Sequence, residues 1–243
     1  MRFVWLTVIL FFIATGGLFA DAASDFAKAN REYAAGHFQA AGEGYAALVR
    51  AGQWNPTLFY NLANAYYRRG DLARAILNYE RVLALEPHHA EATANLQLVR
   101  DQAHALELTA KWPDHFLASI GSDSYAWMTT IGFWIGTFAL AALAFRRSTS
   151  KAVVMIAAFL FCGGSLYALY AIENGNRGDS FAIVTGKNID ARLATADNAN
   201  SVLALPAGSE IKILSTRGDW SYAALPNNLR GWIPTKSAEL VRM

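Results

Sequence analysis

The side chains that usually carry chemistry are few in this chain and are not grouped as an active site would require. A single cysteine, Cys162, lies in an apolar run, where formation of a reactive thiolate is disfavoured. The five histidines are His37, His88, His89, His104 and His115. His88 and His89 follow Pro87 at a junction between expected helices, and we interpret them as a solvated turn rather than a metal site. The chain has no Walker A loop, no G-x-S-x-G elbow and no H-E-x-x-H pair. We therefore predict a protein that is not an enzyme and that uses no metal or cofactor.

Polar side chains at helical spacing make binding a better prediction than catalysis. Residues at positions i, i+3, i+7, i+10 and i+11 share one face of a helix, and here they are Thr57, Tyr60, Asn64, Tyr67 and Arg68. Hydroxyl and amide groups can hold a peptide backbone, and arginine can add a charge-assisted bond to a carboxylate. The alternative is an ordinary polar face that only contacts water.

The opposite face of the same segment is an apolar stripe, which predicts that the helix packs against a partner. The stripe on the first helix is Phe59, Leu62, Ala63 and Tyr66, and the next helix continues it with Ala75, Tyr79 and Val82. Gly70-Asp71 marks a turn between the two helices, and Pro87 closes the second helix. This pattern resembles a tetratricopeptide repeat, a pair of antiparallel helices of about 34 residues.

A weaker copy of the pattern lies one period upstream. Phe26, Ala29, Gly36, Phe38, Ala41, Tyr45 and Leu48 precede Tyr60, Ala63, Gly70, Leu72, Ala75, Tyr79 and Val82 by that period. Downstream, Asn95-Leu96 repeats Asn61-Leu62, and the pattern fades after Arg100. We predict a repeat domain over residues 23–110 with two repeats, an insertion near Gln53-Trp54 in the first, and a capping helix that ends near residue 110.

The tetratricopeptide resemblance implies a concave groove lined by the polar face. Asn30 precedes Asn64 by one period, and paired asparagines at these positions resemble part of a clamp for a peptide backbone or a C-terminal carboxylate. The clamp is incomplete, because Phe26 and Ala94 occupy positions where a cation would help. The resemblance thus implies a peptide-binding site at Asn30, Tyr60, Asn64, Tyr67 and Arg68.

Composition and apolar runs predict a membrane protein. Hydrophobic residues make up 54% of the chain and charged residues 16%, while a net charge of +2 without a long basic run gives no support for nucleic-acid binding. Residues 1–22 combine a cation, an apolar run and Ala20-Asp21-Ala22, which indicates a signal peptide cleaved after Ala22. An uncleaved anchor is the alternative, and either one exports the repeats.

Two further apolar runs, residues 125–145 and 152–172, are each long enough to cross a bilayer as a helix. The loop 146–151 between them carries three cations, Arg146, Arg147 and Lys151, which favours the cytoplasmic side. With linkers at 111–124 and 173–179, both globular parts would then face the periplasm of a bacterium from its inner membrane. Gly132 and Gly136 indicate close packing within the pair of spans or self-association, or have no special role.

Residues 180–243 change character, because β-branched and aromatic residues alternate between turn signals. Leu205-Pro206-Ala207-Gly208, Gly218-Asp219-Trp220 and Gly231-Trp232-Ile233-Pro234 together resemble the bacterial SH3-like domain, a small all-β barrel. Trp220, Tyr222 and Trp232 would line an aromatic platform for a peptide, or the two tryptophans would fill the barrel core. We favour the core for the tryptophans, because a small domain needs large side chains to bury enough area, and Tyr222 for the surface.

The predicted architecture is a multidomain chain of all-α tetratricopeptide hairpins, a two-helix transmembrane hairpin and an SH3-like barrel. This order, with Phe59 to Asp71 and Ala75 to Arg81, resembles the tetratricopeptide-containing, BatE-like members of the Bat (Bacteroides aerotolerance) group. The resemblance implies partners with von Willebrand A domains and a MoxR-type ATPase. We predict a membrane scaffold of such an assembly; the alternative is an adaptor that binds peptidoglycan peptides and recruits cell-wall enzymes.

Overall fold

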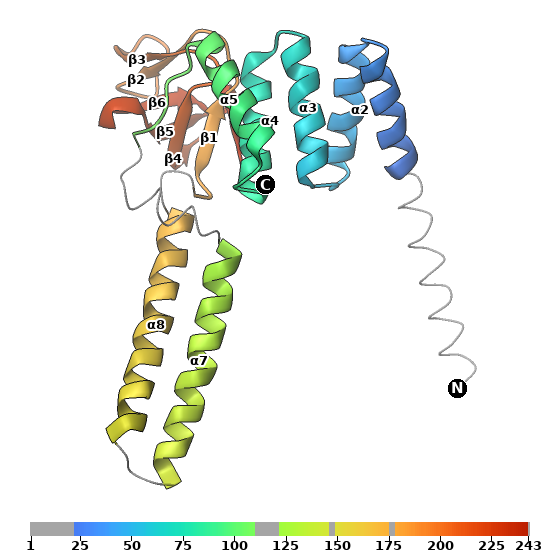
Figure 1. The fold of residues 1–243 in the computed structure, drawn as a ribbon. Coiled ribbons are helices and arrows are strands. Elements are labelled where there is room, and N and C mark those ends of the chain that lie inside the picture. The colour runs from blue at the N-terminus through green and yellow to red at the C-terminus, as the bar shows by residue number, and fades with distance from the viewer. Residues whose placement is uncertain (1–21, 110–121, 146–148, 175–177, 243) are drawn as a thin grey trace, which may run out of the picture.

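The computed structural model describes residues 22–109, 122–145, 149–174 and 178–242 (Figure 1). The expected signal peptide, apart from its last residue, lies outside the described residues, as do parts of both expected linkers and of the loop 146–151. Their boundaries stay predictions.

The N-terminal part is a row of helices, each antiparallel to the next, that stack side by side (Figure 1). They comprise residues 22–34, α2 (Phe38–Arg50), α3 (Pro56–Arg68), α4 (Leu72–Leu85) and α5 (Ala90–Ala103). Local chemistry sets their ends. Asn55 accepts a hydrogen bond from the Leu58 amide at the start of α3, and Asp71 accepts one from the Arg74 amide at the start of α4. The helical hairpins predicted from the sequence are therefore confirmed.

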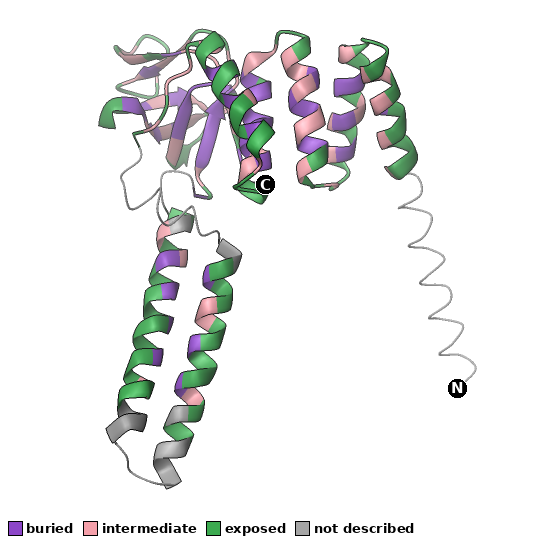
Figure 2. Ribbon diagram, in the orientation of Figure 1, coloured by how far each residue is buried: buried purple, intermediate pink, exposed green. Residues whose placement is uncertain are grey.

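Small residues allow the helices to approach closely, as the sequence pattern predicts. Ala63 on α3 and Ala75 on α4 have no exposed surface, and Phe59 and Tyr79 are buried with them. Figure 2 shows buried stretches on α2, α3 and α4. A second cluster around Tyr45 lies between α2, α3 and the first helix. Each interface between helices thus contains buried residues from the adjacent helices, as expected for stacked repeats.

The helix α5 ends earlier than the sequence predicts. It stops at Ala103, because His104 adopts a left-handed backbone conformation with φ of 51°, and the expectation of a helix to about residue 110 is wrong. Beyond it the chain lies along the C-terminal sheet, where the Glu210 amide donates to the Leu106 carbonyl oxygen over 2.8 Å. Pairing with the sheet replaces the last helical turns.

The C-terminal part is an antiparallel sheet in the order β3-β2-β6-β5-β4-β1-β7. Its strands are β1 (Phe181–Val184), β2 (Ile189–Arg192), β3 (Ser201–Leu205), β4 (Glu210–Arg217), β5 (Trp220–Ala224), β6 (Arg230–Pro234) and β7 (Ala238–Leu240). Two short 3-10 turns, η1 (Pro226–Asn228) and η2 (Thr235–Ser237), flank β6. The expected strands on both sides of Gly218 are confirmed as β4 and β5.

The sheet corrects one prediction about the aromatic residues. Trp220 and Trp232 do not belong to the buried core, because Ser221 and Ala223 take the inward positions of β5 and leave the tryptophans on the other face. The inward face is closely packed at Gly231. A Cβ added at Gly231 would lie 3.0 Å from the Ala191 Cβ, so small residues are needed where β6 approaches β2.

The sheet packs directly against the last helices of the row (Figure 1). Phe181 and Ile183 of β1 belong to the same buried cluster as Ile76 of α4 and Val99 of α5, and so does Val241, which follows β7. The sheet therefore covers the apolar end of the helical stack, a role that a terminal capping repeat fills in other solenoids.

The helices α7 (Ser122–Phe145) and α8 (Thr149–Asn174) pack on each other and extend away from the globular body (Figure 1). A Cβ added at Gly132 would lie 3.0 Å from the Phe161 ring and 3.3 Å from the Cys162 amide nitrogen, so the glycine permits close contact. Among the described residues one segment, Val153–Ala171, is long and apolar enough to span a membrane. The two-span hairpin therefore stays a prediction.

Candidate functional site

Hydrogen bonds between asparagine and tyrosine repeat along the helical row. The Tyr45 hydroxyl donates to Asn30 Oδ1 over 2.6 Å, and one repeat later the Tyr79 hydroxyl donates to Asn64 Oδ1 over 2.5 Å. We call these four residues the asparagine–tyrosine row. Asn30 and Asn64, which the sequence pattern singles out, thus occupy equivalent positions.

Two more asparagines extend this row, Asn61 on α3 and Asn95 on α5. Asn61 Nδ2 donates to Asn30 Oδ1 over 3.4 Å, and Asn95 Nδ2 donates to the Tyr79 hydroxyl over 3.4 Å. The residues predicted from the sequence did not include Asn61 and Asn95. A signal was present nevertheless, because both asparagines occupy the same position of successive repeats.

The neighbouring asparagines fix the direction of these hydrogen bonds. The Tyr79 hydroxyl accepts from Asn95 and therefore donates to Asn64, and Asn30 Oδ1 accepts from both Tyr45 and Asn61. Burial raises the pKa of both phenols, that of Tyr45 to about 12. Asn30 and Asn64 must then accept with Oδ1, which leaves their Nδ2 groups as donors toward a ligand. Amide donors of this kind suit the carbonyl oxygens of a peptide backbone.

The other predicted residues of the helical face surround this row and are partly engaged with the protein. The Tyr60 hydroxyl accepts from Asn95 over 3.2 Å, and its ring stacks on His89 at 5.1 Å between centroids. Tyr67 accepts from Gln102 over 3.3 Å. These contacts hold both phenol rings in place.

Arg68 lies in the last turn of α3 and is exposed. Its guanidinium carbon is 4.3 Å from the centroid of the Phe38 ring on α2, a cation–π contact. This contact orients the arginine while its donor edge stays available to a carboxylate.

Tyr222, the remaining predicted site residue, lies apart from this face, on the sheet. Its ring is 5.1 Å from the Trp232 ring on β6, and cross-strand pairing places Trp220 opposite Pro234 beside them. The structure thus does not bring Tyr222 together with the asparagine–tyrosine row. It forms an aromatic strip of its own, composed of Trp220, Tyr222, Trp232 and Pro234.

A buried ion cluster joins the helices to the sheet, and no sequence signal indicates it. Arg100 of α5 donates to Glu80 of α4 and to Glu210 of β4, and it lies 3.4 Å from Glu107. Glu210 has no exposed side-chain surface, and its Oε2 accepts from the Leu108 amide over 2.9 Å. One cation thus links carboxylates from two elements that are far apart in the chain.

Histidines do not gather into a metal centre within the described ranges. His89 accepts from the Ala92 amide at the start of α5, so it serves as a helix cap, and its Nδ1 lies 3.2 Å from Glu91. Across the described residues no group of three or more histidine, cysteine, aspartate or glutamate side chains could hold a metal ion.

Comparison with known protein families matches residues 56–89 to the tetratricopeptide repeat. No curated protein matches the chain significantly. The matched segment covers α4 and also α3, which carries Tyr60, Asn64, Tyr67 and Arg68. The chain therefore contains a tetratricopeptide repeat, a non-catalytic repeat fold that generally binds protein partners.

Proposed function

We propose that this protein is a non-enzymatic scaffold or adaptor, anchored in a membrane, whose helical repeats bind partner proteins. The observation that carries the proposal is the asparagine–tyrosine row. Two equivalent asparagines, Asn30 and Asn64, accept from tyrosine with their carbonyl oxygens, and both residues are partly exposed, so their amide groups can donate to a ligand. A row of fixed donors suits an extended peptide, whose carbonyl oxygens also recur at regular spacing.

Arg68 gives the face its charge preference. The guanidinium is exposed and is supported by the Phe38 ring, so it can meet an acidic side chain or a C-terminal carboxylate of the partner. A charge-assisted hydrogen bond of this kind contributes about 1.5 to 3 kcal/mol. We expect the bound segment to be extended and to carry at least one carboxylate.

The test must spare the fold, because Asn64 also supports buried Tyr79. Asn64→Ala would leave the Tyr79 hydroxyl short of an acceptor, whereas Asn64→Asp retains an acceptor oxygen there and replaces the amide donor with a negatively charged acceptor, which would also repel a carboxylate of the partner. We expect Asn64→Asp combined with Arg68→Ala to reduce recovery of partners from solubilised membranes about tenfold. Arg50→Ala, in the last turn of α2, is the matched control. Equal recovery by the double variant and the wild type would exclude this face.

The proposed anchor is the hairpin of α7 and α8. Large apolar side chains on both helices are exposed to solvent, among them Trp127 and Leu160, and such a surface needs an apolar surrounding. Gly132 supports close packing of the pair, and Val153–Ala171 meets the length and hydropathy of a span. Together with the cations of loop 146–151, these features favour two spans with the repeats and the sheet on the periplasmic side.

Reporter fusions test this topology. Alkaline phosphatase fused after Thr109 and after Met243 should be active in both cases, because this enzyme functions only outside the cytoplasm. A fusion within the loop 146–151 should be inactive and serves as the control. An active loop fusion, or an inactive fusion at either outer position, would contradict the proposed orientation.

We further propose that the partners belong to a Bat-like envelope assembly for aerotolerance. The order of elements supports this proposal: helical repeats, an apolar helical pair and a C-terminal β-sheet, which we infer to be an SH3-like barrel. Membrane proteins with von Willebrand A domains are the expected partners, together with a MoxR-type ATPase. Their absence from affinity-purified material would refute this assignment and leave the scaffold role untouched.

One observation favours the cell-wall adaptor as a second candidate. The strip of Trp220, Tyr222, Trp232 and Pro234 lies on the outer face of the sheet, where it can stack on peptides or sugar rings. Sedimentation with purified peptidoglycan discriminates between the candidates. The adaptor role predicts binding that Tyr222→Ala with Trp232→Ala abolishes, whereas the Bat-like role predicts no sedimentation.

A further inference from the structure

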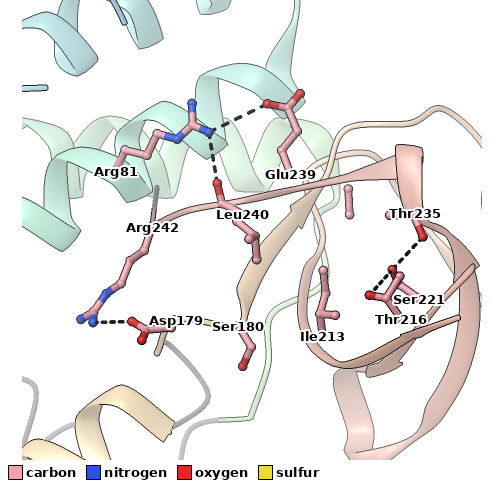
Figure 3. A pocket seen from close by; sticks show the side chains of 11 residues that line it. Arg81, Asp179, Ser180, Ile213, Thr216, Ser221, Thr235, Glu239, Leu240 and Arg242 are labelled. Atoms are coloured by element: carbon pink, nitrogen blue, oxygen red, sulfur yellow. Dashed lines mark hydrogen bonds and ion pairs between the residues drawn. The ribbon is translucent and has the colours of Figure 1, made fainter. Parts of the chain in front are cut away.

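A cleft of about 690 Å³ opens where the last helices meet the sheet (Figure 3). Arg81 of α4 and Glu239 of β7 form one end, and Asp179 and Arg242 form another, while hydroxyl groups of β4, β5 and η2 lie on the far side (Figure 3). Its volume lies within the range of small-ligand sites.

Arg81 is a nearly buried cation whose charge is incompletely balanced. Its side chain is 10% exposed, and its Nη2 donates to the Leu240 carbonyl oxygen over 3.1 Å. Its nearest carboxylate, Glu239, is 3.9 Å away, which is too far for a hydrogen bond. Arg81 Nε is buried and has no hydrogen-bond partner within the described part of the chain. A buried charge with an unused donor is costly unless an anion completes it.

Electrostatics support the same conclusion. Burial lowers the pKa of Arg81, and the nearby Glu239 carboxylate offsets only part of this effect. The Glu239 side chain is 44% exposed, so it can turn toward solvent and leave its place near the guanidinium to another carboxylate. The arginine thus prefers an additional or a better-placed negative charge.

The rest of the cleft indicates what carries that charge. Leu240 and Ile213 line it with apolar surface. On the far side, the hydroxyl of Ser221 lies 3.0 Å from that of Thr235 and 3.4 Å from that of Thr216. These hydroxyl groups bond to one another, but each has two acceptor lone pairs besides its donor, so they retain capacity for peptide amides that an alkyl chain would not use.

We propose that this cleft binds the C-terminal carboxylate of a peptide whose last residue is apolar. The carboxylate binds at Arg81 and the apolar side chain lies over Leu240 and Ile213. Two cations and two carboxylates line the cleft, and Arg242 pairs with Asp179 at 3.1 Å, so the lining has no excess positive charge to hold a doubly charged phosphate. This site is separate from the helical face proposed above, and it does not depend on that proposal.

The experiment uses the detergent-solubilised full chain and titration calorimetry with two matched probes. N-acetyl-Ala-Leu with a free carboxylate should bind saturably, and its C-terminal amide should bind at least about tenfold more weakly. Arg81→Lys keeps the positive charge but removes Nε, and it should weaken binding of the acid about tenfold. Arg74→Lys, on the same helix but outside the cleft, should bind as the wild type does.

A second variant protects the test against misfolding of the first. Thr235→Val preserves side-chain shape, removes one hydroxyl of the far wall, and should weaken binding about threefold or more. Equal affinity for acid and amide, or no saturable binding of either, would overturn the proposal. Octanoate that binds as tightly as the peptide would show a fatty-acid site instead, and displacement of the peptide by inorganic phosphate would show a phosphate site. Asn64→Asp should leave this binding unchanged.

Discussion

Replacing Arg100 with methionine should strongly destabilise the contact between the helical row and the sheet. Arg100 is the cation that holds Glu80 and Glu210, whose side chains are 4% and 0% exposed. Methionine fills similar space but leaves both buried carboxylates without this counter-charge. Breaking a buried ion pair in this way costs about 3 to 5 kcal/mol. Since domains are stable by about 5 to 15 kcal/mol, this loss is a large part of the total.

The assay is urea denaturation of the full chain in detergent, followed by circular dichroism and by hydrogen exchange of β1. We expect a lower midpoint and faster exchange in β1, because the ion cluster joins α4 and α5 to the sheet. Arg74→Met is the control: Arg74 is 46% exposed in its pair with Asp71, and loss of this pair should cost less than about 1 kcal/mol. Adding Glu80→Gln and Glu210→Gln to Arg100→Met should recover part of the stability by removing the unpaired charges. A loss below about 1 kcal/mol for Arg100→Met would refute a sealed, buried cluster.

Two further predictions concern a close contact and a titration. Gly208→Ala should destabilise the contact between sheet and helices by about 1 to 3 kcal/mol beyond Gly52→Ala. Both glycines have positive φ, but a Cβ at Gly208 would lie 2.5 Å from Ile76 Cδ1, whereas Gly52 has open space; equal melting temperatures would contradict this. The raised pKa of Tyr45 means that its stabilising effect is complete below about pH 10, the ordinary value, and is lost as pH rises to about 12. Tyr45→Phe should therefore flatten the loss of stability over that interval, measured by alkaline denaturation, and an unchanged profile would exclude the assigned role.

Local patterns predicted most elements of the fold. The stripe from Phe59 to Tyr66 follows from helical periodicity, and the alternation around Glu210 follows from the pleat of a strand. The end of α5 was mispredicted, because the residues after His104 gain hydrogen bonds to the sheet that no local pattern contains. The candidate site shows the same division. The sequence placed Asn30 and Asn64 on one face, but it did not indicate that buried tyrosines set the direction of their amides.

The sequence also did not determine the face of the sheet on which the tryptophans lie. In a strand, a shift of one residue exchanges the two faces, so Trp220 and Ser221 are equally able to point inward until the neighbouring strands are in place. The close approach of β6 to β2 excludes a large side chain at Gly231, which lies on the inner face. Packing therefore decided the orientation, although residue size favoured the opposite one.

The sequence by itself determined the repeating helices, the strands and the apolar runs, because each depends on the spacing of side chains along one stretch of backbone. Only the tertiary structure decided that the sheet covers the end of the repeats, that Arg100 meets Glu80 and Glu210, and that Arg81 lies in a cleft. Arg100 and Glu210, for example, are 110 residues apart in the chain. Their proximity depends on how two surfaces fit together, and that fit is a property of the folded whole rather than of any local pattern.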